Sequence, residues 1–313
     1  MRHNKKIYEK LTGVWSAAPT PLNEKMDVDI ESVALMVEHH VKIGINGIFL
    51  FGTNGEGPAL TEKQKIDLLD AAIKYNKERM VIAVQITDNS SQKMIENAKK
   101  FADAGADILV MSSPYFFHRP DKHRLFKLYE DVLKRVNLPV GFYDRGDYSS
   151  VKIPVWVLKK LYKNEKLIII KDSSSDDERM KIVLDARRKN KKIRIFNGDE
   201  FQCVKYLQAG YDGLLLGGGV FNGFIASKII DAVNNKNINE GERWQFLMNK
   251  IMYAVYGGKK IRCWLAGEKY LLKKMGIFSS YKNLYGYVLD ERCKKSIDSV
   301  FEKYQDLLLP YKK

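Results

Sequence analysis

The amino-acid sequence predicts an α/β fold, a (β/α)8 TIM barrel with a C-terminal helical segment. Two observations lead to this prediction: short apolar runs rich in strand-forming residues recur along the chain, and amphipathic helical patterns separate them. Eight such runs occur, at residues 13–19, 47–51, 80–85, 107–111, 138–142, 167–170, 193–196 and 213–216. Parallel strands need a long crossover connection, so eight strand–helix units predict a closed barrel.

Helix signals fall between the predicted strands. Thr61 opens a helical pattern and Gln64 follows three residues later, which is the arrangement of a capping box. Gly44 and Gly105 stand where two helices should end before the next strand begins. The clearest amphipathic patterns cover residues 29–44, 61–76 and 91–105.

The pattern changes after residue 223, where long helical stretches continue without further strands. We therefore expect residues 1–223 to form the barrel that carries the active site. Residues 224–313 should supply the last barrel helix and a C-terminal helical segment packed on the barrel. No Gly-, Ser- or Pro-rich linker separates the two parts.

The composition excludes several classes of protein. The net charge is +15, but the basic residues are interleaved with acids on helical patterns and no nucleic-acid-binding motif accompanies them. No apolar run approaches the roughly 18 to 20 residues of a membrane span, and the polar N-terminus lacks the apolar core of a signal peptide. We expect a cytoplasmic protein that binds neither nucleic acid nor a membrane.

The cysteines give no sign of a structural framework. Cys203, Cys263 and Cys293 are an odd number at wide spacings, without a CxxC pair or a neighbouring histidine cluster. A disulfide framework or a zinc site is therefore not expected. The sequence predicts no metal and no cofactor.

Catalytic residues of a (β/α)8 barrel lie at the carboxyl ends of its strands. Lys171 ends the apolar run 167–170. Burial there would disfavour the ammonium form, and the neutral amine could attack a carbonyl carbon to form a Schiff base. The same pattern also fits a lysine whose charged end reaches solvent from a strand end.

Tyr143 ends the preceding strand, so it should lie beside Lys171. A phenol in that position could carry protons to and from a substrate. A tyrosine that follows an apolar run is otherwise most often a core or rim aromatic.

The segment GTNGEG, residues 52–57, follows the second predicted strand. Its glycines permit tight turns and a close approach of backbone N–H groups to a ligand, and Thr53 and Asn54 could hydrogen-bond a carboxylate. Glu56 could complement the dipole of the following helix. The segment has neither the GxGxxG spacing nor the GK[ST] ending of a nucleotide loop, and an ordinary strand-to-helix turn explains it equally well.

Several segments in order resemble one enzyme family: GVWSAAPTPL, FGTNGEGPALT, SSPYFF, FYD, IIIKDSS, NGDE and GYDGLLLGG. Together they resemble the dihydrodipicolinate synthase and N-acetylneuraminate lyase family of class I aldolases. The resemblance implies a (β/α)8 barrel with C-terminal helices that assembles as a homotetramer or dimer of dimers and acts on pyruvate. It also implies catalytic roles for Lys171 as the Schiff-base lysine, Tyr143 as the proton relay, and Thr53. Thr53 and Asn54 would hold the 2-oxo acid carboxylate, with Gly52 and Leu215 completing the substrate pocket.

Two departures from the synthase pattern bear on the substrate. Tyr148 stands where the synthases have an arginine for the carboxylate of aspartate semialdehyde, and Arg145 lies three residues earlier. Phe116 stands where the synthases have the second tyrosine of a pair, while Tyr115 keeps the first. A phenyl ring cannot relay a proton, and a lost guanidinium removes a charge-assisted pair.

Three functions follow as hypotheses. The first is a pyruvate-dependent Schiff-base lyase or aldolase acting on a hydroxylated or sugar-derived 2-oxo acid, with Asp199 and Glu200 binding substrate hydroxyls. An alternative role for these two acids is to cap the following helix. The second function is 4-hydroxy-tetrahydrodipicolinate synthase, which condenses pyruvate with aspartate semialdehyde. The third is a non-catalytic basic barrel that binds a ligand or nucleic acid.

Overall fold

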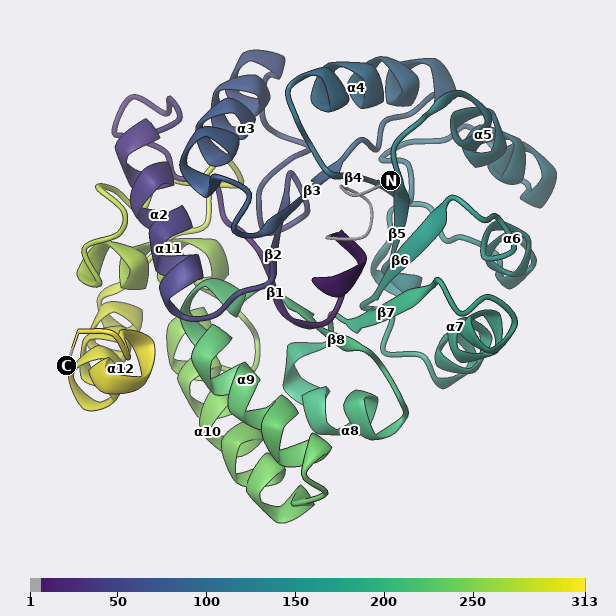
Figure 1. The fold of residues 1–313 in the computed structure, drawn as a ribbon. Helices are drawn as coiled ribbons and strands as arrows, with labels where there is room; N and C mark the ends of the chain where they lie inside the picture. Colours follow the sequence, from purple (N-terminus) through teal and green to yellow (C-terminus); the bar gives the residue numbers. More distant parts are fainter. Residues whose placement is uncertain (1–6, 313) are drawn as a thin grey trace.

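A closed barrel of eight parallel strands forms the centre of the molecule, and a computed structural model describes residues 7–312 of the chain (Figure 1). Each strand pairs with its sequence neighbours, and β8 closes on β1. The strands are β1 (Gly13–Ala17), β2 (Gly47–Leu50), β3 (Val81–Gln85), β4 (Ile108–Ser112), β5 (Val140–Asp144), β6 (Leu167–Asp172), β7 (Arg194–Asn197) and β8 (Gly213–Leu216). The predicted (β/α)8 fold is confirmed.

Helices surround the barrel and follow the strands in turn (Figure 1). The capping box of Thr61 and Gln64 is present, and Gly44 and Gly105 adopt the left-handed conformation just after helices, as predicted. The surrounding helices are α2 (Ile30–Lys42), α3 (Glu62–Asn76), α4 (Ser91–Asp103), α5 (Lys122–Arg135), α6 (Val155–Leu161), α7 (Asp177–Lys189), α8 (Cys203–Gln208) and α9 (Gly219–Asn234). Short 3₁₀ turns, η1 (Gly146–Tyr148) and η2 (Glu200–Gln202), follow β5 and β7.

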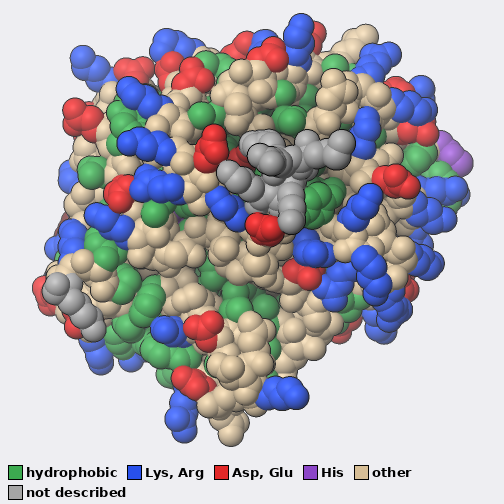
Figure 2. Space-filling view, viewed as in Figure 1, with side chains coloured by type: hydrophobic (Ala, Val, Ile, Leu, Met, Phe, Trp, Pro, Cys, Tyr) green, Lys and Arg blue, Asp and Glu red, His purple; other side chains and the backbone are tan. Residues whose placement is uncertain are grey.

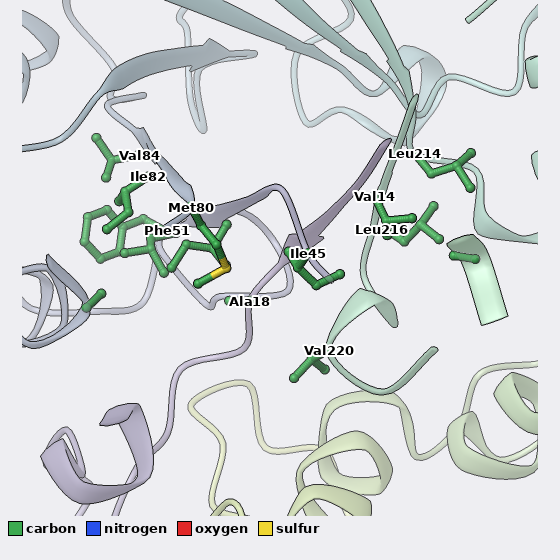
Figure 3. Packing of buried hydrophobic residues seen from close by; sticks show 14 of the residues in the cluster. Val14, Ala18, Ile45, Phe51, Met80, Ile82, Val84, Leu214, Leu216 and Val220 are labelled. Carbon is green, nitrogen blue, oxygen red and sulfur yellow. The ribbon is translucent and has the colours of Figure 1, made fainter. Parts of the chain in front are cut away.

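Alternate strand residues form two separate apolar clusters. One cluster fills the barrel interior and contains Trp15, Phe49 and Phe196, together with Ile7 and Leu11 from the segment before β1. The other lies between the strands and the helices, and Figure 3 shows part of it, with several side chains projecting from neighbouring strands. This separation follows from the two-residue period of a strand, and it decides which side chains can face a substrate.

Three further helices extend the chain on one side of the barrel: α10 (Ile238–Tyr256), α11 (Trp264–Lys274) and α12 (Glu291–Leu308) (Figure 1). Helix α10 packs along α9, and α11 and α12 pack against α10. The segment that follows α11 contacts the loop after β2, because the backbone N–H of Leu284 donates to the Glu56 carboxylate. The C-terminal helices are thus joined to the strand-end side of the barrel.

One expectation about the cysteines is wrong. Cys263, just before α11, and Cys293, in the first turn of α12, form a disulfide. The two residues are 30 positions apart, and only the packing of α11 on α12 brings them together. Sequence spacing carries no signal of that packing. Cys203 is a free, buried thiol.

Charged side chains are spread around the molecule. On the face shown in Figure 2, Lys and Arg side chains are interspersed with Asp and Glu over many helices. On this face, the distribution is that of solvated helix surfaces with charges of both signs. Within residues 7–312, no helix combines the length and the apolar character that crossing a membrane requires.

A buried ion pair fixes the strand end that carries Tyr143. The carboxylate of Asp144, the next residue, accepts two hydrogen bonds from Arg179 of α7, at 2.7 and 2.8 Å. Arg179 also donates to the carbonyl of Ile153 at 2.7 Å, and both charged side chains are only 3% exposed. The pair ties the end of β5 to the outer helix layer.

We expect Arg179→Met to lower the free energy of unfolding by about 3–5 kcal/mol, because it leaves the Asp144 carboxylate buried without its cation. Guanidinium denaturation measures the change. Lys63→Met is the control, since Lys63 pairs with Asp67 on the surface with its side chain 84% exposed, and such exposed pairs add little to stability. Equal effects of the two substitutions would contradict the role given to Arg179.

Candidate active site

Lys171 and Tyr143 lie side by side inside the barrel. They are register partners on β5 and β6, and both side chains are buried, at 7% exposure each. The Lys171 Nζ lies 4.4 Å from the centroid of the Tyr143 ring and 5.5 Å from that of Phe49. The strand-end lysine therefore points inward, and it is not a lysine that extends into solvent.

The surroundings of Lys171 favour the neutral amine. Burial lowers the pKa of its ammonium group, and the Arg145 charge acts in the same direction, against the attraction of Tyr143 and Glu200. A lysine with a lowered pKa has a larger population of the unprotonated form that attacks a carbonyl carbon.

The surroundings of Tyr143 favour loss of its phenol proton. Burial opposes ionisation, but the charges of Lys171 and Arg145 and a hydrogen bond with Thr53 outweigh it, so the pKa lies below its usual value. A phenol with a lowered pKa, next to a nucleophilic amine, can give up and recover a proton during a reaction.

The turn over residues 52–57 presents open backbone donors. Within residues 7–312, no group accepts a hydrogen bond from the backbone N–H of Thr53, Asn54 or Gly55. The turn is tight, since a Cβ at Gly57 would lie 1.8 Å from the Phe51 carbonyl oxygen, and only glycine fits there. Successive free N–H groups in a turn form a site for an anion such as a carboxylate.

The Asn54 side-chain amide is engaged within the protein. Its amide nitrogen donates to the carbonyl of Ala17 at 2.9 Å, to that of Gly217 at 3.2 Å, and to Glu268 Oε1 at 3.0 Å. The amide thus holds the turn between the ends of β1 and β8. The backbone N–H groups of Thr53, Asn54 and Gly55 have no acceptor within residues 7–312, whereas the Asn54 side-chain donors are engaged within the protein.

The expectation that Glu56 complements a helix dipole is wrong. Glu56 is fully buried in the left-handed conformation, six residues before α3 begins, and its carboxylate pairs with Lys269 of α11. Lys269 donates a second hydrogen bond to the Lys282 carbonyl at 2.8 Å. The sequence could not indicate this pair, because 213 residues separate its members.

A cavity of about 280 Å³ lies beside Tyr143. Its lining includes Thr53, Tyr115, Arg145 and Tyr285. Within residues 7–312, no carboxylate pairs with the Arg145 guanidinium, so this cation faces the cavity uncompensated. Tyr148 does not line the cavity and is 66% exposed, and Phe116 is 65% exposed.

The remaining predicted site residues, Asp199, Glu200 and Leu215, all make contacts within the protein. Asp199 caps η2, with its carboxylate accepting from Phe201 N–H, Ser175 and Gln202, which is the capping alternative. Glu200 accepts from Gly218 N–H at 2.7 Å and from the Tyr256 hydroxyl at 2.9 Å. Leu215 belongs to the apolar cluster inside the barrel.

Two residues near the site were not predicted from the sequence. Gly198, just after β7, would place a Cβ 1.9 Å from Ser173 Oγ and 2.7 Å from Lys171 Cε, so only glycine leaves room for both side chains. Glu268 of α11 is fully buried and contacts Asn54. A glycine directly after a strand is a weak signal that could have identified Gly198. Nothing in the sequence around Glu268 distinguishes it from other helix residues.

A buried amine beside a phenol at the strand ends of a (β/α)8 barrel is the arrangement of a class I aldolase. The Dihydrodipicolinate synthetase family model matches residues 10–288. The chain therefore belongs to this family, as the sequence motifs indicated, and it is a carbon–carbon lyase or aldolase of that family.

Known relatives agree in sequence and in fold. The chain is 26% identical to the 4-hydroxy-tetrahydrodipicolinate synthase of Heliobacterium modesticaldum, over 78% of this chain and 79% of the relative. Dihydrodipicolinate synthase from Bacteroides thetaiotaomicron is 25% identical with a TM-score of 0.85, covering 94% of this chain and 98% of that one. N-acetylneuraminate lyase from Fusobacterium nucleatum, at 19% identity and a TM-score of 0.83 over 94% and 99% of the chains, shares the fold.

We expect Gly198→Ala to slow covalent labelling of Lys171 by pyruvate and borohydride about 100-fold or more, because the added methyl group displaces the amine from its reacting position. The φ of residue 198 does not itself require glycine, so the melting temperature, measured alongside, reports only what the contacts with Ser173 and Lys171 cost the fold. Gly241→Ala is the control, since its Cβ would meet neighbours at an ordinary 3.5 Å. Wild-type labelling of Gly198→Ala would show that Lys171 does not need this space.

Proposed function

We propose that this protein is a pyruvate-dependent class I aldolase in which Lys171 forms a Schiff base. The observation that supports the proposal best is the inward-facing Lys171, held beside Tyr143 and next to a turn of open N–H groups. The turn would bind the carboxylate of pyruvate and so bring its keto carbon toward the amine.

The reaction follows from these groups. The neutral Lys171 amine attacks C2 of pyruvate, a C–N bond forms, and the keto oxygen leaves as water after it gains protons. The protonated imine then withdraws electrons from C3, which loses a proton to give an enamine. The enamine carbon attacks the carbonyl carbon of a second substrate, and hydrolysis of the imine frees Lys171. Cleavage is the reverse sequence, and Tyr143 carries protons in both directions.

The cavity favours a second substrate that bears a carboxylate. Arg145 lies in the cavity wall without a carboxylate partner among residues 7–312, and a guanidinium binds a carboxylate with paired, charge-assisted hydrogen bonds. Arg145 would take the place of the arginine that the sequence lacks at Tyr148. This supports condensation of pyruvate with aspartate semialdehyde, the reaction for which the Heliobacterium relative is named.

The second candidate is cleavage of a hydroxylated or sugar-derived 2-oxo acid. Glu200 favours it, because this acid is close enough to Lys171 to influence its pKa and could accept hydrogen bonds from substrate hydroxyls. Both Glu200 oxygens already accept hydrogen bonds within the protein, so the geometry supports the carboxylate-bearing aldehyde more strongly.

Incubation with pyruvate and borohydride should add one reduced pyruvyl group at Lys171, detected by peptide mass spectrometry. The labelling rate should fall as the pH drops below the pKa of Lys171, because the ammonium form then predominates and has no free electron pair.

Tyr143→Phe should slow labelling about 100-fold through loss of the proton carrier. Lys166, which donates to backbone carbonyls near the other end of β6, is the internal control and should stay unlabelled. An unlabelled Lys171 would refute the proposed mechanism.

Arg145→Met should raise the KM for aspartate semialdehyde about 10- to 100-fold, the loss expected for a hydrogen-bonded charge pair, with little effect on pyruvate labelling. A coupled assay of pyruvate consumption measures it. Lys152→Met is the matched control, since Lys152 pairs with Asp147 and does not line the cavity. Release of pyruvate from 2-oxo-3-deoxy sugar acids, without turnover of aspartate semialdehyde, would favour the second candidate.

A further inference from the structure

One of the contacts that hold the substrate-binding turn comes from a carboxyl group outside the barrel. Two of the three acceptors of the Asn54 amide are backbone carbonyls at the ends of β1 and β8. The third is Glu268 Oε1, which α11 brings to the turn from 214 residues away. Glu268 is the one side chain that accepts from the Asn54 amide nitrogen within residues 7–312.

The position of Glu268 favours its neutral form. The side chain has no exposure, and within residues 7–312 no cation pairs with it and no group bonds its Oε2. The adjacent Lys269 is engaged by Glu56 and by the Lys282 carbonyl. A buried carboxylate without a cation is strongly unfavourable, so such a group keeps its proton.

Two neighbouring acids act in the same direction as burial. Burial raises the pKa of Glu268 well above its usual value, and Glu200 of η2 and Glu56 raise it further. The Asn54 hydrogen bond and the Lys269 charge oppose this shift without cancelling it. Tyr256 of α10 also lies near, and its own pKa is raised by burial and by both Glu200 and Glu268.

We propose that Glu268 is a positioning residue for the carboxylate of the 2-oxo acid: as a neutral acid it fixes the Asn54 amide and, through it, the turn whose N–H groups receive that carboxylate. The inference rests on the proposed function, in which the substrate is a 2-oxo acid. A neutral Glu268 adds no negative charge behind the turn, whereas its ionised form would repel the bound carboxylate.

The principal measurement is the Kd of oxamate, a carboxylate-bearing analogue of pyruvate that forms no Schiff base, by calorimetry. Glu268→Leu should weaken oxamate binding about five- to tenfold, because the turn loses one hydrogen bond worth about 1 kcal/mol. Glu268→Gln keeps a neutral acceptor of the same shape and should bind within about twofold of wild type.

Two further measurements separate positioning from a general structural effect. Labelling of Lys171 by hydroxyacetone and cyanoborohydride should be unchanged in Glu268→Leu, because this ketone has no carboxylate. As the pH rises into the alkaline range, oxamate binding should weaken in wild type as Glu268 ionises. It should weaken less in Glu268→Gln, which cannot ionise.

Leu272→Ala is the matched control, since Leu272 is a fully buried residue of the same helix that makes no hydrogen bond to the turn. It should lower the melting temperature and leave the Kd of oxamate unchanged.

The inference is overturned by any of three results: Glu268→Gln binds oxamate as weakly as Glu268→Leu does, Glu268→Leu slows hydroxyacetone labelling as much as it weakens oxamate binding, or the wild type binds no oxamate. If oxamate binding depends on Glu268 but pyruvate does not label Lys171, the Schiff-base mechanism is refuted and the positioning role of Glu268 stands.

Discussion

The pairing register of β5 and β6 is the constraint on which the site depends. It sets Tyr143 opposite Lys171 inside the barrel and Asp144 opposite Asp172 outside it. A shift of one residue would exchange the two faces and would turn Lys171 toward the helices. An irregularity between Val140 and Gly141 adjusts this register, and the interior cluster accordingly contains two consecutive residues, Ile168 and Ile169.

The outer face of the same strands secures the inner face. Asp144 is bound by Arg179, and Asp172 accepts hydrogen bonds from the Tyr211 hydroxyl at 2.5 Å and from Ser174. Each acid directly follows a site residue, Tyr143 or Lys171. Because neighbouring residues on a strand share one rigid backbone, polar contacts between the barrel and its helices fix the reacting side chains within it.

The sequence was sufficient to predict what depends on local pattern. The eight strands are marked by apolar runs, and Lys171 and Tyr143 are polar residues at the ends of such runs, so the sequence predicted that they lie side by side at the strand ends. The roles of Glu56, Glu268 and the disulfide could not be predicted in this way. Each of them depends on where α11 packs, and helix packing has no signal in the spacing of residues along the chain.

The C-terminal helical segment is connected to the site through a buried ion pair between Lys269 and Glu56. Glu56 has an unfavourable left-handed backbone, and its buried carboxylate needs both the Lys269 cation and the Leu284 N–H. The same contacts bring Tyr285 to the cavity wall. The two buried carboxyl groups thus differ in their partners. Glu56 of the turn pairs with Lys269, whereas within residues 7–312 no cation pairs with Glu268 of α11. A single lysine on α11 therefore gives its charge to one of the two carboxyl groups, and the other is held next to the turn by a hydrogen bond with Asn54 instead.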